Sequence, residues 1–228
     1  MRSPQLHESS EKSGRPDIDS AGHIGIIDYG ICNVGSVRNM LRRSGALATC
    51  ISSPDELADF DRIILPGVGH FQAGMANLAN GGWIEPIRHI ALVEKKRILG
   101  ICLGMQLLAH HSEEGDCEGL GLLDMDVKHF DRSRLSAELP IPHMGWSEVD
   151  AVGAHPLTHS EQAEKQRFYF VHSLHVSLRS DGVQPLFWCN YGYPFIAGCA
   201  RDNIMGMQFH PEKSHMFGVE LLTNFARM

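Results

Sequence analysis

The chain of 228 residues lacks several features that would point to a membrane, secretion or nucleic acids. No apolar run approaches the roughly 20 residues that a membrane-spanning helix needs, so the sequence predicts no membrane association. The first residues are polar and predict no secretory signal. There is no long block of Lys or Arg, and the formal net charge is -7. This charge balance argues against a nucleic-acid partner.

Cysteine and histidine are present, but in no pattern typical of a metal site. The six cysteines include no C-x-x-C pair, and the 14 histidines include no H-E-x-x-H frame. Scattered single cysteines fit reduced thiols in a cytoplasmic protein better than a disulfide framework. We therefore expect a cytoplasmic protein that uses no metal and no other cofactor.

The composition is ordinary for a soluble globular enzyme, with 43% hydrophobic and 21% charged residues. Residues 1–22 are polar and charged, which is typical of a disordered leader without chemistry of its own. The remaining length suits one domain of generous size, predicted over residues 23–228. We find no internal repeat and no low-complexity tract.

The first half of the chain alternates between short apolar runs and amphipathic runs. Buried strands are predicted at 23–28, 46–51, 62–65 and 96–99, and helices at 34–44, 53–57, 72–79, 84–95 and from 106 to about 112–115. This alternation predicts an α/β fold with a mainly parallel sheet and helices on both faces. Ligands then gather outside the carboxyl ends of the strands.

The second half has a different texture, with short strand-like runs separated by turn residues. Strands are predicted at 125–130, 147–152, 168–176, 186–191, 195–201 and 204–209, and a last helix at 216–227. We interpret these runs as antiparallel strands that extend the main sheet or form a small side sheet.

One stretch has the form of a nucleophile elbow, with Cys102 between Gly100 and Gly104 at a predicted strand-to-helix junction. A sharp turn there strains the backbone of the nucleophile, and the glycines leave room for close backbone approach. The start of a helix favours the thiolate, which is the reactive form of cysteine. The alternative is a small buried cysteine in a glycine-containing turn.

A cysteine nucleophile needs a base that takes its proton and later protonates a leaving group. His210 is the best candidate because it follows a predicted strand and so lies at the same sheet edge. Pro211 stiffens the loop, and Glu212 can reach the far imidazole nitrogen and fix its tautomer. Alone, this run would be a polar turn. His172 falls within a strand-like run and is expected in the core or an interface.

These two motifs make the chain similar to the class I (triad) glutamine amidotransferases. Further stretches narrow the resemblance to the glutaminase subunits of imidazole glycerol phosphate synthase: Ile26–Gly30, Leu65–Phe71, Pro142–Trp146, Tyr169–Ser173 and Gln208–Ser214. The match runs from Ile24 to the end of the chain. It implies a flavodoxin-like class I amidotransferase fold and the hydrolysis of L-glutamine to glutamate and ammonia.

The resemblance also implies roles for individual residues. Cys102 would attack the glutamine side-chain amide, His210 would protonate the departing ammonia, and Glu212 would complete the triad. Backbone N–H groups of Val68 and Leu103 would form the oxyanion hole. The substrate would be held by Gly67, Gln106, Glu114, His172 and Ser173, with the Glu114 carboxylate suited to the α-ammonium group.

In this family the ammonia passes into a (β/α)8-barrel cyclase subunit, so the resemblance implies a heterodimer that serves histidine biosynthesis. The positions that match the partner-facing surface are Asn33, Trp146, Tyr169 and Lys213, whose plainer interpretation is a solvated surface with some core aromatics.

Other interpretations stay open. The run Lys213–Gly218 is similar to relatives that feed ammonia to a sugar amidotransferase in surface-polysaccharide biosynthesis. A non-catalytic module would require a broken triad, and Gln106 and the His-Pro-Glu run disfavour a cysteine peptidase.

Overall fold

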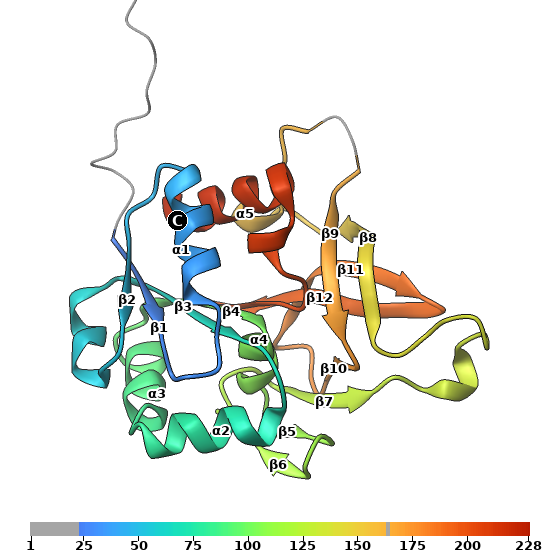
Figure 1. Ribbon diagram of the computed structural model, residues 1–228, viewed down its shortest axis with the longest axis horizontal. Helices are drawn as coiled ribbons and strands as arrows, with labels where there is room; N and C mark the ends of the chain where they lie inside the picture. The colour runs from blue at the N-terminus through green and yellow to red at the C-terminus, as the bar shows by residue number, and fades with distance from the viewer. Residues whose placement is uncertain (1–22, 163–164) are drawn as a thin grey trace, which may run out of the picture.

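The computed structural model describes residues 23–162 and 165–228. The predicted leader over residues 1–22 lies outside the described residues. Within the described part, the strands join into one sheet in the order β2-β1-β3-β4-β13-β12-β10-β7-β5-β6, and β11, β8 and β9 branch from β12. Helices lie above and below the parallel strands (Figure 1).

The first half follows the predicted strand–helix alternation. Its elements are β1 (Ile24–Ile27), α1 (Val34–Arg43), β2 (Ala48–Ile51), a 3₁₀ helix (Pro54–Asp59), β3 (Arg62–Gly67), α2 (Phe71–Asn80), α3 (Ile84–Leu92) and β4 (Arg97–Cys102). Strands β2, β1, β3 and β4 pair in parallel, and β13 (Ile204–Met207) joins β4 in parallel. The predicted parallel sheet is confirmed.

Successive strand residues face opposite sides of the sheet, and each side has its own apolar core. Ile26 and Ile64 pack with α1 and with α5 (His215–Arg227). Ile27 and Leu65 pack with α2 and α3 on the opposite side. Because strand side chains alternate with a period of two, apolar residues at successive positions require a cover on both faces.

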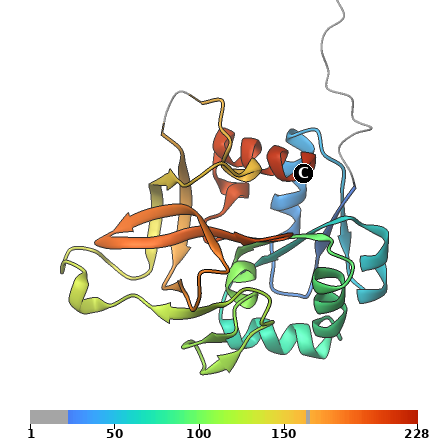
Figure 2. The same ribbon diagram turned by 180° about the vertical axis from the view of Figure 1, so that it is seen from behind.

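The second half consists mainly of antiparallel strands, as predicted. They are β5 (His111–Ser112), β6 (Cys117–Glu118), β7 (Met125–His129), β8 (His143–Ala151), β9 (Arg167–His172), β10 (Leu174–Leu178), β11 (Gln184–Tyr191) and β12 (Tyr193–Arg201). Short 3₁₀ helices lie at Arg132–Arg134, Pro156–Thr158 and Pro211–Lys213. The strands both extend the main sheet and branch from it, and the β11–β12 hairpin projects well beyond the parallel strands (Figure 2).

The helix after Cys102 is much shorter than predicted: α4 spans Leu103–Leu107 and does not reach 112–115. The carbonyls of Leu107, Leu108 and Ala109 would serve the next turn of a longer helix. They instead accept hydrogen bonds from N–H groups of residues 120–123. The returning segment thus replaces the helix with tertiary hydrogen bonds, which a local pattern does not reveal.

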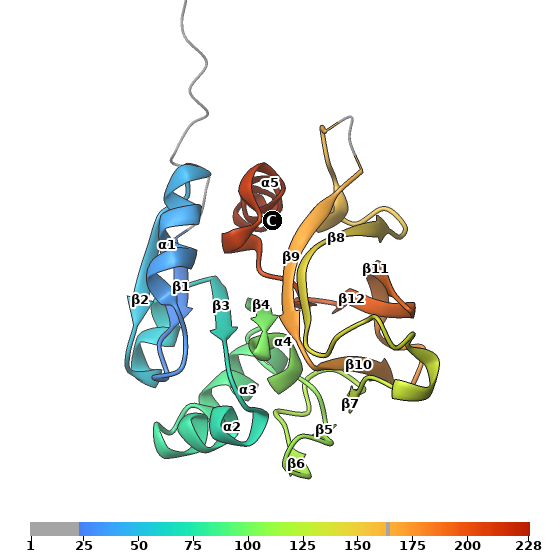
Figure 3. The same cartoon turned by 45° about the vertical axis from the view of Figure 1, so that its right-hand side comes forward.

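The predicted strand 168–176 is in fact two strands, β9 and β10, separated at Ser173. β9 pairs with β8, whereas β10 pairs with β7 and β12. Figure 3 shows β9 rising away from β10 at this break. The chain therefore changes partners at a point that faces the end of β4.

The glycines around Cys102 allow α4 to lie directly against the sheet. A Cβ at Gly100 would lie 2.7 Å from the carbonyl oxygen of Gly104, and a Cβ at Gly104 would overlap the carbonyl oxygen of Leu65. Only glycine permits this approach of backbone to backbone.

We predict that Gly104→Ala lowers the free energy of unfolding by about 2 kcal/mol or more, because the added methyl group forces α4 away from β3. The matched control is Gly35→Ala in α1, where the nearest atom would lie 3.8 Å from the new Cβ. The free energy of unfolding of that variant should rise by roughly 0.4–1 kcal/mol. Equilibrium urea unfolding measures both, and equal stability of the two variants would contradict the packing argument.

Candidate active site

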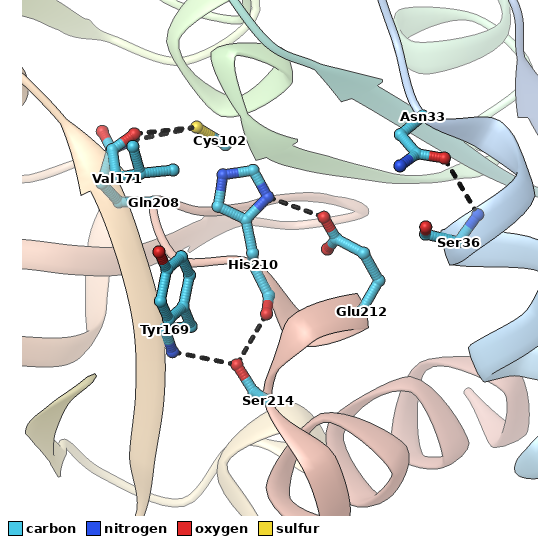
Figure 4. A network of polar contacts seen from close by, with 9 residues as sticks. All are labelled: Asn33, Ser36, Cys102, Tyr169, Val171, Gln208, His210, Glu212 and Ser214. Carbon is cyan, nitrogen blue, oxygen red and sulfur yellow. Dashed lines mark hydrogen bonds and ion pairs between the residues drawn. The ribbon is translucent and has the colours of Figure 1, made fainter. Parts of the chain in front are cut away.

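Cys102 lies at the end of β4 and directly before α4, with backbone angles φ 54° and ψ -112°. This left-handed conformation is uncommon for a residue with a side chain, and it is the strain that a nucleophile elbow imposes. The backbone thereby turns the sulfur out of the sheet edge, towards His210 and Val171 (Figure 4). The thiol is buried and directs its S–H towards the carbonyl oxygen of Val171 at 4.0 Å.

His210 and Glu212 form a buried pair beside Cys102. The imidazole Nδ1 lies 2.6 Å from Glu212 Oε1, and the two side chains are only 1% and 5% exposed. The other ring nitrogen, Nε2, lies on the Cys102 side of the ring (Figure 4). It has no hydrogen-bond partner within the described residues. A free imidazole nitrogen facing a thiol is the arrangement that proton transfer between them requires.

Two opposing effects set the charge of His210. Burial by itself lowers the pKa of the imidazole. The interactions with Cys102 and Glu212 raise it by more than burial lowers it, and the resulting pKa is about 9. His210 is therefore protonated at neutral pH. An imidazolium beside a cysteine favours the thiolate and can protonate a leaving amine.

Ser214 fixes the loop that carries His210, a role that no sequence motif indicates. Its buried hydroxyl donates to the His210 carbonyl at 2.6 Å and accepts from the Tyr169 N–H at 3.0 Å. The His210 N–H in turn donates to the Tyr169 carbonyl at 2.9 Å. These bonds tie the loop to β9, so the imidazole has little freedom to leave the sulfur.

A cavity of about 290 Å³ opens beside the sulfur. It brings together residues that the sequence placed far apart: Val68, Cys102, Leu103, Gln106, Glu114, His172, Ser173 and His210, together with Gly69, Pro142, Val171 and Leu174. Two of the expected residues do not line it. Gly67 pairs with Cys102 in the β3–β4 ladder, and Glu212 lies behind the His210 ring.

Glu114 contributes the carboxylate of this cavity. Its Oε2 accepts from the Phe71 N–H at 2.6 Å, at the first residue of α2. The start of a helix attracts a negative charge, so this contact holds the carboxylate at a fixed place. The cavity therefore offers a cationic ligand group a fixed negative partner.

Behind the cavity, His172 and His143 belong to a chain of hydrogen bonds. Only one assignment of donors and acceptors satisfies the whole chain. The Leu174 carbonyl can only accept, so His172 Nδ1 donates to it at 2.7 Å. His172 Nε2 then accepts from His143 Nδ1 at 3.1 Å, and His143 Nε2 accepts from the Ser147 hydroxyl at 2.8 Å.

Burial keeps both of these histidines neutral, since it lowers the pKa of His172 to about 3 and that of His143 to about 4. A neutral ring whose two nitrogens are both engaged cannot act as the base. His172 is therefore a core residue that also lines the cavity.

The loop after β3 does not aim its expected donor at the cavity. The Val68 N–H donates instead to the Ile31 carbonyl at 3.1 Å. Gly69 follows with a φ of 101°, a conformation that favours glycine. The position expected to supply half of an oxyanion hole is therefore engaged elsewhere in this structure.

The family model described as "Glutamine amidotransferase class-I" matches residues 25–228. The chain belongs to the class-I glutamine amidotransferases. The predicted family is confirmed, and with it the fold class.

The chain is similar to "Imidazole glycerol phosphate synthase subunit HisH 2" of Pseudomonas aeruginosa, with 44% identity over 89% of this chain and 98% of the relative. A subunit of the same name from Methanococcus maripaludis is 43% identical over 90% of this chain and 98% of the relative. "HisH 1" of Campylobacter jejuni is 42% identical over 90% of this chain and 100% of the relative.

Solved structures share the fold at lower identity. "Structure of PurLQS from Thermotoga maritima" matches with a TM-score of 0.66 and 23% identity, over 89% of this chain and 94% of that chain. "Crystal structure of glutamine amidotransferase" matches with a TM-score of 0.65 and 17% identity, over 87% of this chain and 98% of that chain.

The other cysteines of this amidotransferase are unsuited to nucleophilic attack. Burial raises the pKa of Cys32, Cys189 and Cys199 to about 12. It also raises the pKa of Cys50 and Cys117, with nearby carboxylates adding to the effect. These five thiols therefore stay protonated at neutral pH and are poor nucleophiles.

Three of the four residues expected at a partner interface lie together on the surface. Trp146 is exposed and its ring lies 6.3 Å from that of Tyr169, over which Lys213 Nζ lies at 5.7 Å. Asn33 comes from a different element, and its side chain accepts from the Ser36 N–H at 3.2 Å as the cap of α1 (Figure 4).

Within residues 23–162 and 165–228, no helix is long and apolar enough to cross a membrane. Nor do those residues contain a group of three or more His, Cys, Asp or Glu side chains that could hold a metal ion.

The raised pKa of His210 predicts a pH-dependent stability. A folded-state pKa of about 9 against an ordinary 6.5 gives a stabilisation that is complete below pH 6.5 and lost as the pH rises through 9. The loss should be on the order of 3 kcal/mol. Urea unfolding at pH values from 6 to about 10 measures it.

Glu212→Gln removes the buried carboxylate and should make this fall distinctly shallower. Glu85→Gln, at a side chain 80% exposed, is the control that should leave it unchanged. If the stability of Glu212→Gln has the same pH dependence as that of the unchanged chain, the contact with Glu212 is not what keeps His210 charged.

Proposed function

We propose that this chain is the glutamine-hydrolysing subunit of imidazole glycerol phosphate synthase, which supplies ammonia to a partner subunit in histidine biosynthesis. The observation that carries the proposal is the buried Cys102–His210–Glu212 arrangement beside a cavity of about 290 Å³. Relatives with 42–44% identity over about 90% of the chain carry that name and support the pathway.

The reaction runs in two stages on this arrangement. The Cys102 sulfur attacks the side-chain amide carbon of glutamine and forms a tetrahedral intermediate. His210 gives its proton to the nitrogen as the C–N bond breaks, which releases ammonia and leaves a thioester. Neutral His210 then takes a proton from water, whose oxygen attacks the thioester, and glutamate leaves as Cys102 recovers. Glu212 stabilises each imidazolium that forms.

The cavity suits the two ends of the substrate. The Glu114 carboxylate, anchored on the start of α2, pairs with the α-ammonium group of glutamine. Gln106, His172 and Ser173 line the same cavity, and Gly67 lets β3 pass close to Leu103 and Gly104. A glutamine placed this way presents its side-chain amide to Cys102.

The ammonia acceptor is a (β/α)8-barrel cyclase subunit, bound as a heterodimer in the cytoplasm. Exposed Trp146 and Met144 and the Lys213–Tyr169 contact support a docking face around β8 and the loop after β13. Asn33 would extend this face on the other side of the cavity.

Cys102→Ala should abolish glutamine-dependent synthesis by the complex, with a loss of at least about 10³-fold. Synthesis from added ammonium salt should continue, because the partner's own site is intact. Assays of the complex with each nitrogen source measure both. Equal loss with glutamine and with ammonium would show that Cys102 is structural, or that the variant fails to bind the partner.

The Val68 contact predicts that the isolated subunit is slow. An oxyanion hole needs a second N–H beside that of Leu103, and the Val68 N–H is bonded to Ile31. Gly67 and Gly69 allow the intervening peptide to rotate at low cost. The partner would favour the rotated loop to the extent that it binds that state more tightly.

Because one missing oxyanion donor costs roughly 10²–10³ in kcat, partner and acceptor together should activate glutaminase by about this factor, mainly in kcat. Steady-state glutaminase assays test this activation in the subunit alone, with the partner, and with the partner plus the acceptor. Full activity of the isolated subunit, or activation confined to KM, would refute the gating.

A further inference from the structure

Gln208 is a fully buried amide that contacts the Cys102 sulfur, and the reaction described above gives it no part. Its Nε2 lies 3.8 Å from Cys102 Sγ. Its Oε1 accepts from Gln106 Nε2 at 3.0 Å. Gln106 Nε2 also donates to the Leu174 carbonyl at 3.4 Å, so two glutamines link a main-chain carbonyl to the sulfur.

The orientation of the Gln208 amide is dictated by this chain of bonds. The Leu174 carbonyl can only accept, so Gln106 must turn its NH₂ group towards it. The same NH₂ group faces Gln208, which must therefore present its oxygen to Gln106. The NH₂ group of Gln208 is left pointing at the sulfur, because the reverse orientation would set two donors against each other.

The backbone of Gln208 is as firmly held as its side chain. Its N–H donates to the Ala197 carbonyl at 2.8 Å. The next residue, Phe209, stacks on Phe168 with ring centroids 3.9 Å apart. Gln208 and His210 both lie beside the Cys102 sulfur (Figure 4), whereas Phe209 packs among the core aromatics. One short segment thus directs two polar groups at one sulfur.

We propose that Gln208 is a further catalytic residue, whose amide N–H donates a hydrogen bond to the Cys102 thiolate. The proposal rests on Cys102 being the nucleophile. The Val171 carbonyl oxygen, 4.0 Å from the sulfur, favours the S–H form. The neutral N–H donor of Gln208 offsets that preference, and it does so without taking up His210 Nε2. His210 is then free to serve the leaving nitrogen.

The experiment is the pH dependence of Cys102 alkylation by iodoacetamide in the full chain, with the labelled cysteine located by mass spectrometry. Gln208→Met keeps the length of the side chain but not the donor. In this variant the pH midpoint of Cys102 alkylation should rise by about one pH unit. Alkylation below the midpoint should then be about tenfold slower. With the partner bound, kcat for glutamine should fall about tenfold, with KM changed less than threefold.

A second variant, Gln208→Glu, keeps the shape and the acceptor for Gln106 but sets a carboxyl group against the sulfur. Its midpoint should rise further, because two negative charges at one site oppose each other. The matched control is Gln166→Glu, another buried glutamine, which directly precedes β9 at the end remote from His172. It should keep the midpoint of the unchanged chain.

Thermal unfolding verifies that each variant is folded, and if Gln208→Met does not fold, Gln208→Glu decides. An unchanged alkylation midpoint in a folded variant would overturn the role of Gln208. Failure of the proposed function looks different: a glutamine-analogue electrophile would then not label Cys102 even in the unchanged chain.

Discussion

The rest of this structure depends on the contact between α4 and the backbone of β3. Gly104 lies so close to the Leu65 carbonyl that no side chain fits between them. This approach ends β4 abruptly, holds Cys102 at a φ of 54°, and sets the sulfur beside the loop that follows β13. A wider separation of α4 from β3 would leave Cys102 in an ordinary strand-to-helix turn. His210 and Gln208 would then no longer lie beside its sulfur.

The same type of side chain has opposite charge states in neighbouring places. His143 and His172 are buried without an anionic partner, and burial lowers their pKa to about 4 and 3. His210 is equally buried, but the Glu212 carboxylate and the Cys102 sulfur hold its pKa near 9. Burial alone removes a charge, whereas burial with a paired anion keeps it. The acid of the reaction is thus selected by its neighbours and not by exposure.

The sequence predicted the elements whose causes are local. Alternating apolar runs gave the parallel half of the sheet, and the glycines around Cys102 gave the elbow. Prediction was wrong where distant segments compete for the same backbone groups. Residues 120–123 take the carbonyls that a longer α4 would have used, and β9 and β10 have different partner strands on either side of Ser173. No local period carries that information.

By itself, the sequence determined the fold class through its alternating apolar periods, and the family and the residue types of a cysteine–histidine–glutamate site through short motifs, because each of these patterns is local. Only the tertiary structure decided how those groups are satisfied. It bonded the Val68 N–H to Ile31, oriented the rings of His143 and His172, and set the Gln208 amide against the sulfur. The physical reason is that each of these hydrogen bonds joins separate parts of the chain, 106 positions apart for Gln208 and Cys102, so its direction follows from packing and not from neighbours in sequence.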